Sequence, residues 1–155
     1  MTRSVLVDSN LLFVLIVGST GRNHVGRARR TEQYSPEDFD LLQSALAEYY
    51  EVMVTPHVLA ETSNLLGYLS EPLLSTARST LRYMLANWSE RCAPSIEVVD
   101  APTYLRLGVT DSALFLAASA TTALFTDDFP LYLAASKAGR PAVNFTHLRQ
   151  QRGTL

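Results

Sequence analysis

Acidic residues border apolar segments at four places in this chain. One follows the apolar run at 5–7, one lies in an apolar helical stretch at 58–61, one opens a segment rich in Ala, Leu and Phe, and a pair follows the apolar run at 123–126. These acids are Asp8, Glu61, Asp111, Asp127 and Asp128. Acids in such surroundings need a cation, yet no run of Lys or Arg flanks them and the chain has a single lysine, Lys137. A divalent metal would supply the charge, and metal-assisted phosphoester hydrolysis is the chemistry it would serve.

Each acid, taken alone, also has a purely structural interpretation. Asp8 could cap the helix that follows it, and Glu61 could lie on a solvated helix face. Asp111 and the pair Asp127–Asp128 would be stabilised at helix N-termini by the helix dipole without any metal. The metal hypothesis is favoured because all four positions point toward one end of one sheet.

That sheet is predicted from short apolar runs that alternate with helical patterns. The runs at 4–7, 52–54, 123–126 and 142–145 resemble strands of a parallel sheet, and 96–99 is a weaker candidate. Strands alternating with helices predict an α/β three-layer sandwich with a central, mainly parallel sheet of four to five strands. Ligands of such sheets bind outside the carboxyl ends of the strands, where Asp8 and the pair Asp127–Asp128 would lie.

Helix-start signals place the remaining acids. Ser35-Pro36 and Thr55-Pro56 predict capped helix starts, Ser70 a helix to about Trp88, and Thr110 the cap of a helix beginning at Asp111. In the helix after Thr55, the polar residues share one face and could line a cleft. These residues are His57, Glu61, Asn64 and Tyr68.

Composition indicates one domain spanning residues 1–155. The chain is 47% hydrophobic and 18% charged, with a net charge of −2, which is typical of a globular domain. The lone Cys92 cannot form an internal disulfide, which fits a reducing cytoplasm. The apolar stretch at 11–17 is too short to span a bilayer and no signal peptide is recognised, so we expect a soluble cytoplasmic protein without membrane contact.

Positive charge is concentrated in one irregular stretch at about 18–34. Four arginines lie there with no acid between them: Arg22, Arg27, Arg29 and Arg30. This arginine-rich insertion is either a solvated loop or a contact for the phosphate backbone of RNA. The tail from Arg149 to Leu155 is expected to fray.

Taken in order along the chain, these motifs resemble those of the PIN-domain ribonuclease family. The segment 5–12 is similar to the family's opening, in which the first metal-binding Asp ends the first strand. The segments 55–61 and 109–113 are similar to the segments that carry its second and third acidic positions. The fourth position lies in a T-x-D motif, which Phe125-Thr126-Asp127-Asp128 resembles. The resemblance covers essentially the whole chain. One departure is the longer spacing between Asp8 and Glu61 than in the compact toxin members, which puts the toxin assignment in question but not the nuclease assignment.

The resemblance implies a Mg²⁺- or Mn²⁺-dependent endoribonuclease that leaves a 5′-phosphate and a 3′-hydroxyl. Asp8 and Asp111 are expected as direct metal ligands, with Asp128 completing the site, Asp127 able to contribute, and Glu61 acting through a bound water. Supporting roles are expected for Asn10, Thr126 and Asn64. The expected partners are RNA as substrate, a second copy in a homodimer and, if the protein is a toxin, an antitoxin protein.

Two other functions remain open. A PIN-fold module with weak or no catalysis would only bind RNA or a protein. A phosphatase of the haloacid-dehalogenase type also places acids at strand ends, but it needs a second Asp two residues after the first, where this chain has Asn10, and a lysine near the site. The three histidines show no zinc spacing, and nucleotide-binding glycine motifs and nucleophile elbows are absent from the sequence.

Overall fold

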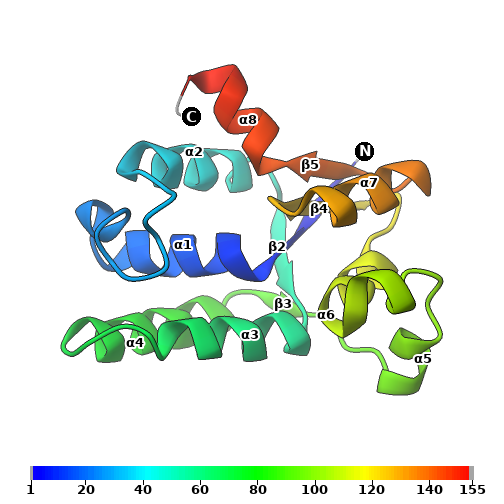
Figure 1. Cartoon of the computed structure of the whole chain (residues 1–155), viewed down its shortest axis with the longest axis horizontal. Helices are drawn as coiled ribbons and strands as arrows, with labels where there is room; N and C mark the ends of the chain where they lie inside the picture. Colours follow the sequence, from blue (N-terminus) through cyan, green and yellow to red (C-terminus); the bar gives the residue numbers. More distant parts are fainter. Residues whose placement is uncertain (1, 154–155) are drawn as a thin grey trace.

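The computed structural model describes residues 2–153 and shows an α/β fold around a five-stranded sheet (Figure 1). All neighbouring strands pair in parallel, in the order β3-β2-β1-β4-β5. The strands are β1 (Ser4–Val7), β2 (Glu51–Val54), β3 (Ser89–Glu90), β4 (Thr122–Thr126) and β5 (Ala142–Asn144). The prediction of a mainly parallel sheet of four to five strands is confirmed.

Helices cover both faces of the sheet and complete a three-layer sandwich. Figure 1 shows α1 to α4 on one side of the strands and α5 and α6 on the other. The helices are α1 (Ser9–Thr20), α2 (Pro36–Leu46), α3 (Pro56–Leu66), α4 (Leu73–Leu85), α5 (Ser95–Val99), α6 (Tyr104–Ala117), α7 (Phe129–Lys137) and α8 (Phe145–Arg152), with a 3₁₀ turn, η1, at Arg22–His24. The first strand is central, and the chain leaves it toward β2 and returns beside it as β4. This reversal between β1 and β4 is the topological switch point, where α/β sheets bind ligands.

The centre of the core is α1, which is apolar on every side. Leu11, Leu12, Val14 and Ile16 are all fully buried, because α1 contacts α2, α3 and α4 at once. A helix that is hydrophobic all round is stable only inside a protein or a membrane. No helix within residues 2–153 combines the length and the apolar character needed to cross a bilayer.

Two predicted helix starts are confirmed by their caps. Ser35 and Asp38 form a reciprocal capping box at α2, and the Thr55 hydroxyl accepts a hydrogen bond from the backbone N–H of Val58 at α3. The start at Ser70 is placed too early: α4 begins at Leu73 after Pro72, and it ends at Leu85 rather than near Trp88.

Three other sequence predictions need correction. The weak strand at 96–99 is the helix α5, because a short apolar run fits either structure and only its packing decides. The edge strand β3 was not predicted, since two residues show no periodicity. The tail does not fray from Arg149 onward, because α8 continues to Arg152 and Arg149 forms a buried ion pair with Asp38; Thr154 and Leu155 lie outside the described residues.

Candidate active site

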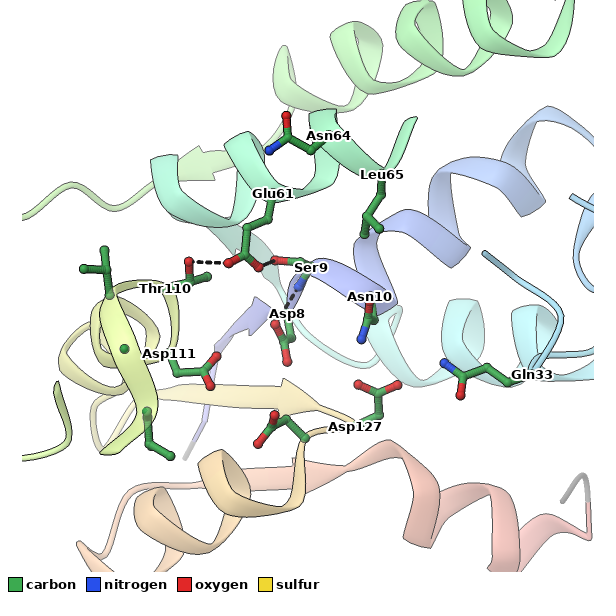
Figure 2. Close-up of a pocket in the computed structure, with 14 residues that line it drawn as sticks. Asp8, Ser9, Asn10, Gln33, Glu61, Asn64, Leu65, Thr110, Asp111 and Asp127 are labelled. Carbon is green, nitrogen blue, oxygen red and sulfur yellow. Dashed lines mark hydrogen bonds between the residues drawn. The ribbon is translucent and has the colours of Figure 1, made fainter. Parts of the chain in front are cut away.

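A cleft of about 740 Å³ lies at the carboxyl ends of β1 and β4. It is lined by acids from four separate segments: Asp8, Glu61, Asp111, Asp127 and Asp128. Figure 2 shows the carboxylates of Asp8, Asp111 and Asp127 directed toward one central space, with Glu61 reaching in from α3. The structure therefore brings together every acid that the sequence singled out.

Asp8 is the most deeply placed of these acids. It follows β1, and only 7% of its surface is exposed. One oxygen caps α1 by accepting a hydrogen bond from the backbone N–H of Ser9 at 2.6 Å, and the other accepts one from the buried Thr126 hydroxyl. Burial raises the pKa of Asp8 to about 6; these two hydrogen bonds oppose the rise, and the charges of Asp127 and Asp128 add to it. The capping role and a ligand role are compatible, because a carboxylate oxygen that accepts one hydrogen bond keeps a second lone pair for a cation.

Asp111 faces the cleft because α6 is broken three residues before it. Gly108 has φ 84° and ψ −174° inside the helix, a conformation that is essentially limited to glycine. The predicted helix start near Asp111 therefore corresponds to a real break. The prediction that Thr110 caps this helix is wrong, because Thr110 lies within α6, whose N-cap is Thr103, and its hydroxyl donates to Glu61.

The pKa of Asp111 is raised to about 7. Desolvation is the largest cause, and the charges of Asp8, Asp128 and Glu61 add to it. Three acids from three other segments are thus close enough to act on this carboxyl group. Such mutual repulsion is the expected behaviour of a metal site without its metal.

Glu61 joins the two walls of the cleft. One of its oxygens accepts a hydrogen bond from the Ser9 hydroxyl at 2.9 Å and the other from the Thr110 hydroxyl at 2.6 Å (Figure 2). These bonds tie α3 to the start of α1 and to the second half of α6. Ser9 and Thr110 were not predicted as part of the site, although both lie next to a predicted acid in the sequence.

The adjacent acids Asp127 and Asp128 have different surroundings. Asp127 accepts a hydrogen bond from the buried phenol of Tyr34. Burial and the Asp127 charge raise the pKa of Tyr34, so the phenol stays protonated as a donor. Asp128 caps α7 through the backbone N–H of Leu131 at 2.9 Å, and its charge acts on both Asp8 and Asp111.

Thr126 organises this corner of the cleft. Its hydroxyl donates to Asp8 and accepts a hydrogen bond from the backbone N–H of Asp128 at 3.0 Å. A single buried side chain therefore fixes the first and the last acid relative to each other.

The amides expected to support the site also line the cleft. Asn10 and Asn64 are both exposed to it, and Gln33 and Leu65 line it as well without having been predicted. The polar stripe of α3 is divided: His57 lines a separate pocket with Arg91 and Cys92, and Tyr68 lies beneath two arginines.

The donor chemistry of the cleft suits a hard divalent cation. Among the described residues that line it there is no Lys or Arg, and its charged groups are all carboxylates. Oxygen ligands of this kind select Mg²⁺ or Mn²⁺ over zinc. As the side chains lie, no three His, Cys, Asp or Glu residues in positions 2–153 form a ready metal geometry, so binding would require the carboxylates to turn toward a common ion.

The four arginines of the insertion lie outside the cleft and differ from one another. Arg22 forms an ion pair with Asp40 at 2.7 Å and a longer one with Glu37 at 3.6 Å, so acids that are distant in the sequence neutralise it. Arg29 and Arg30 stack on Tyr68, and Arg27 is exposed.

Comparison with known proteins supports the fold. The chain resembles the crystal structure of PAE2754 from Pyrobaculum aerophilum, with a TM-score of 0.59 and 16% identity over 100% of this chain and 98% of that one. A domain of a functionally unknown protein from Methanocaldococcus jannaschii aligns with a TM-score of 0.48 and 16% identity over 92% of this chain and 91% of that one. No family model and no curated protein matches the chain. The first likeness shows that the α/β sandwich extends over the whole chain, as in that protein.

Proposed function

We propose that the protein is a PIN-family endoribonuclease that depends on Mg²⁺ or Mn²⁺. The observation that carries the proposal is the convergence of Asp8, Glu61, Asp111 and Asp128 on one cleft that no cation lines. Those acids come from four segments spread over 120 residues, and a structural role for each does not explain why they meet. Their order along the chain also matches the order of the motifs that resemble the PIN family.

Asp8, Asp111 and Asp128 would hold the metal, with Glu61 at the edge of the site. When bound, a divalent ion lowers the pKa of water and neutralises charge on the phosphoryl oxygens. The protein's own contribution is orientation. The Ser9 N–H and the Thr126 hydroxyl fix Asp8, and the cap of α7 holds one oxygen of Asp128. Few rotamers remain to be ordered when substrate arrives.

The reaction is hydrolysis with in-line attack on phosphorus. The attacking water gives up a proton to solvent as its oxygen forms the new bond to phosphorus, and the bond from phosphorus to the 3′-oxygen breaks. The departing 3′-oxygen takes up a proton from solvent and becomes a hydroxyl, and the new terminus carries a 5′-phosphate. Asp8 and Asp111, whose pKa values lie at about 6 and about 7 in the metal-free protein, would both be charged when the cation is present.

The alternatives have less support. A phosphatase of the haloacid-dehalogenase type requires a lysine at the site, and Lys137 is exposed at the end of α7 and does not line the cleft. A PIN-fold module that only binds RNA or protein would not need four acids held against their mutual repulsion. RNA is the proposed substrate, and an antitoxin partner, a homodimer and a cytoplasmic location stay predictions from the sequence.

The proposal is tested with purified protein and a labelled single-stranded RNA of mixed sequence. Cleavage should require Mg²⁺ or Mn²⁺, stop on chelation, and leave 5′-phosphate ends. Millimolar Mn²⁺ should also raise the melting temperature of the wild type by mass action, and Asp111→Asn should reduce that shift. Absence of both cleavage and a thermal shift would refute the proposal, whereas a shift without cleavage would favour the binding module.

A further inference from the structure

Two arginines of the insertion are held on one aromatic ring. The guanidinium carbon of Arg30 lies 4.2 Å from the centroid of the Tyr68 ring, and that of Arg29 lies 5.0 Å from it. Both distances are within the range of a cation–π interaction. Tyr68 is 40% exposed, so this cluster of Arg29, Arg30 and Tyr68 is at the surface and its guanidinium N–H groups can reach solvent.

The backbone at Arg30 adopts a conformation that L residues rarely take. Its φ is 75°, and it is the only residue other than glycine with a positive φ among residues 2–153. A side chain in this conformation is unfavourable, and a glycine would avoid that cost. Residues held in such conformations cluster at functional sites.

The charge of the cluster is not neutralised by an ion pair. Neither Arg29 nor Arg30 lies within 4.0 Å of a carboxylate oxygen in the described part of the chain, whereas Arg22 contacts Asp40 at 2.7 Å. Their charges act on the exposed Glu32, whose pKa is lowered first by hydrogen bonds from backbone N–H groups and then by the charges of Arg30 and Arg29. Two positive charges therefore face one exposed negative charge.

Both segments that carry the cluster also carry residues that line the acidic cleft. Tyr68 lies two residues beyond the end of α3 and four residues after Asn64, which lines the cleft. Gln33, which lines the cleft from the other side, follows Arg30 by three residues. Figure 2 shows Gln33 and Leu65 at the same end of the site, away from Asp111.

We propose that Arg29, Arg30 and Tyr68 form a subsite for the phosphate backbone of the RNA strand that enters the cleft. The inference rests on the proposed function for the identity of the substrate. The acids of the cleft repel a polyanion, so an approaching strand needs cations that the cleft lacks. Tyr68 is a positioning residue: its ring holds two planar guanidinium groups whose N–H donors match phosphate oxygens.

The test measures binding without cleavage. Affinity for a fluorescent single-stranded RNA is titrated at several salt concentrations in chelator, with the intact chain. Arg29→Ala/Arg30→Ala should weaken binding and reduce the magnitude of the salt slope by roughly 1.4, because each lost phosphate contact contributes roughly 0.7. The matched control is Arg22→Ala/Arg27→Ala, which removes the same charge from the same loop and should change the slope by less than half as much.

Two further variants separate the subsite from a fold effect. Arg30→Gly relieves the strained backbone, so it should keep or raise the melting temperature while weakening RNA binding. Tyr68→Phe keeps the ring and should bind as the wild type does, whereas Tyr68→Leu should lose affinity. Equal slopes for the two double variants, or full affinity in Tyr68→Leu, would overturn the subsite. Loss of binding in Arg29→Ala/Arg30→Ala in a protein that never cleaves RNA would keep the subsite and reject the nuclease.

Discussion

Two buried aspartates of this protein, Asp8 and Asp38, have opposite surroundings. Asp38 is fully buried, accepts a hydrogen bond from the Ser35 N–H at 2.8 Å, and forms an ion pair with Arg149 at 3.0 Å. Asp8 is nearly as buried and also lies at a helix start, but its neighbours are Thr126, Ser9 and other acids. One carboxylate has its cation inside the protein, and the other does not.

This difference separates an acid with a structural role from one for which we propose a functional role. A buried carboxylate that has a guanidinium partner needs nothing more from solution. A buried carboxylate surrounded by other carboxylates destabilises the fold. A bound metal ion would supply the missing positive charge and offset this cost. Substitutions at Asp8 and at the ion pair of Asp38 test this difference separately.

The largest expected effect is on the stability of the fold, at the ion pair between Asp38 and Arg149. Arg149→Met leaves Asp38 buried without its cation, which should lower the free energy of unfolding by about 3–5 kcal/mol. Chemical denaturation followed by circular dichroism measures it. The double variant Arg149→Met/Asp38→Leu should recover part of the loss, because it removes the uncompensated charge as well. If the single variant is as stable as the wild type, Asp38 does not depend on Arg149.

The next effect is on catalysis. Asp8→Asn keeps the shape of the side chain but removes the charge that would bind metal, so the rate of RNA cleavage should fall at least a hundredfold, which is about 2.7 kcal/mol of transition-state stabilisation. Single-turnover cleavage in Mg²⁺ measures it. Asp100→Asn, which removes an exposed acid after α5, is the matched control and should retain the wild-type rate.

A third expectation concerns pH in the metal-free protein. The pKa of Asp8 is raised from 3.8 to about 6 and that of Asp111 from 3.8 to about 7. The folded protein therefore holds these protons more tightly than the unfolded chain does, so their stabilising contribution is complete at low pH and is lost as pH rises through 6 and 7. Between pH 5 and pH 8 the free energy of unfolding should fall by about 2 kcal/mol, after allowance for the partial exposure of Asp111.

Denaturant titrations in chelator at these two pH values measure the fall. Asp8→Asn should be more stable than the wild type at pH 8 and should show a smaller dependence on pH. Saturating Mn²⁺ should also reduce the dependence. A wild type that becomes more stable from pH 5 to pH 8 without metal would contradict the picture of crowded acids.

The smallest effect is at the helix break that places Asp111. Gly108→Ala forces an L side chain into φ 84° and should destabilise the fold by about 1 kcal/mol. Nothing lies within 4 Å of the added Cβ, so the cost is in the backbone alone. Thermal melting measures it, with Gly139→Ala as a comparison at a positive φ outside the cleft. Metal binding should weaken only in Gly108→Ala.

Local patterns in the sequence determined most of the sheet and the helix starts. The runs at 4–7, 52–54, 123–126 and 142–145 predicted four of the five strands, because strands buried on both faces require continuous apolar residues. Ser35 and Thr55 predicted their helices, since a cap depends only on a few neighbouring residues. The same reasoning placed Asp8 and the pair Asp127–Asp128 at strand ends, and therefore at one edge of the sheet.

Tertiary structure decided what surrounds each of these residues. Three contacts depend on segments that the fold brings together. They are the ion pairs of Arg149 with Asp38 and of Arg22 with Asp40, and the hydrogen bond from Tyr34 to Asp127. The tail and the arginine-rich insertion appear unstructured in sequence because their partners are far away along the chain. The sequence shows which charges are present, but only the tertiary structure determines whether a buried charge has a partner.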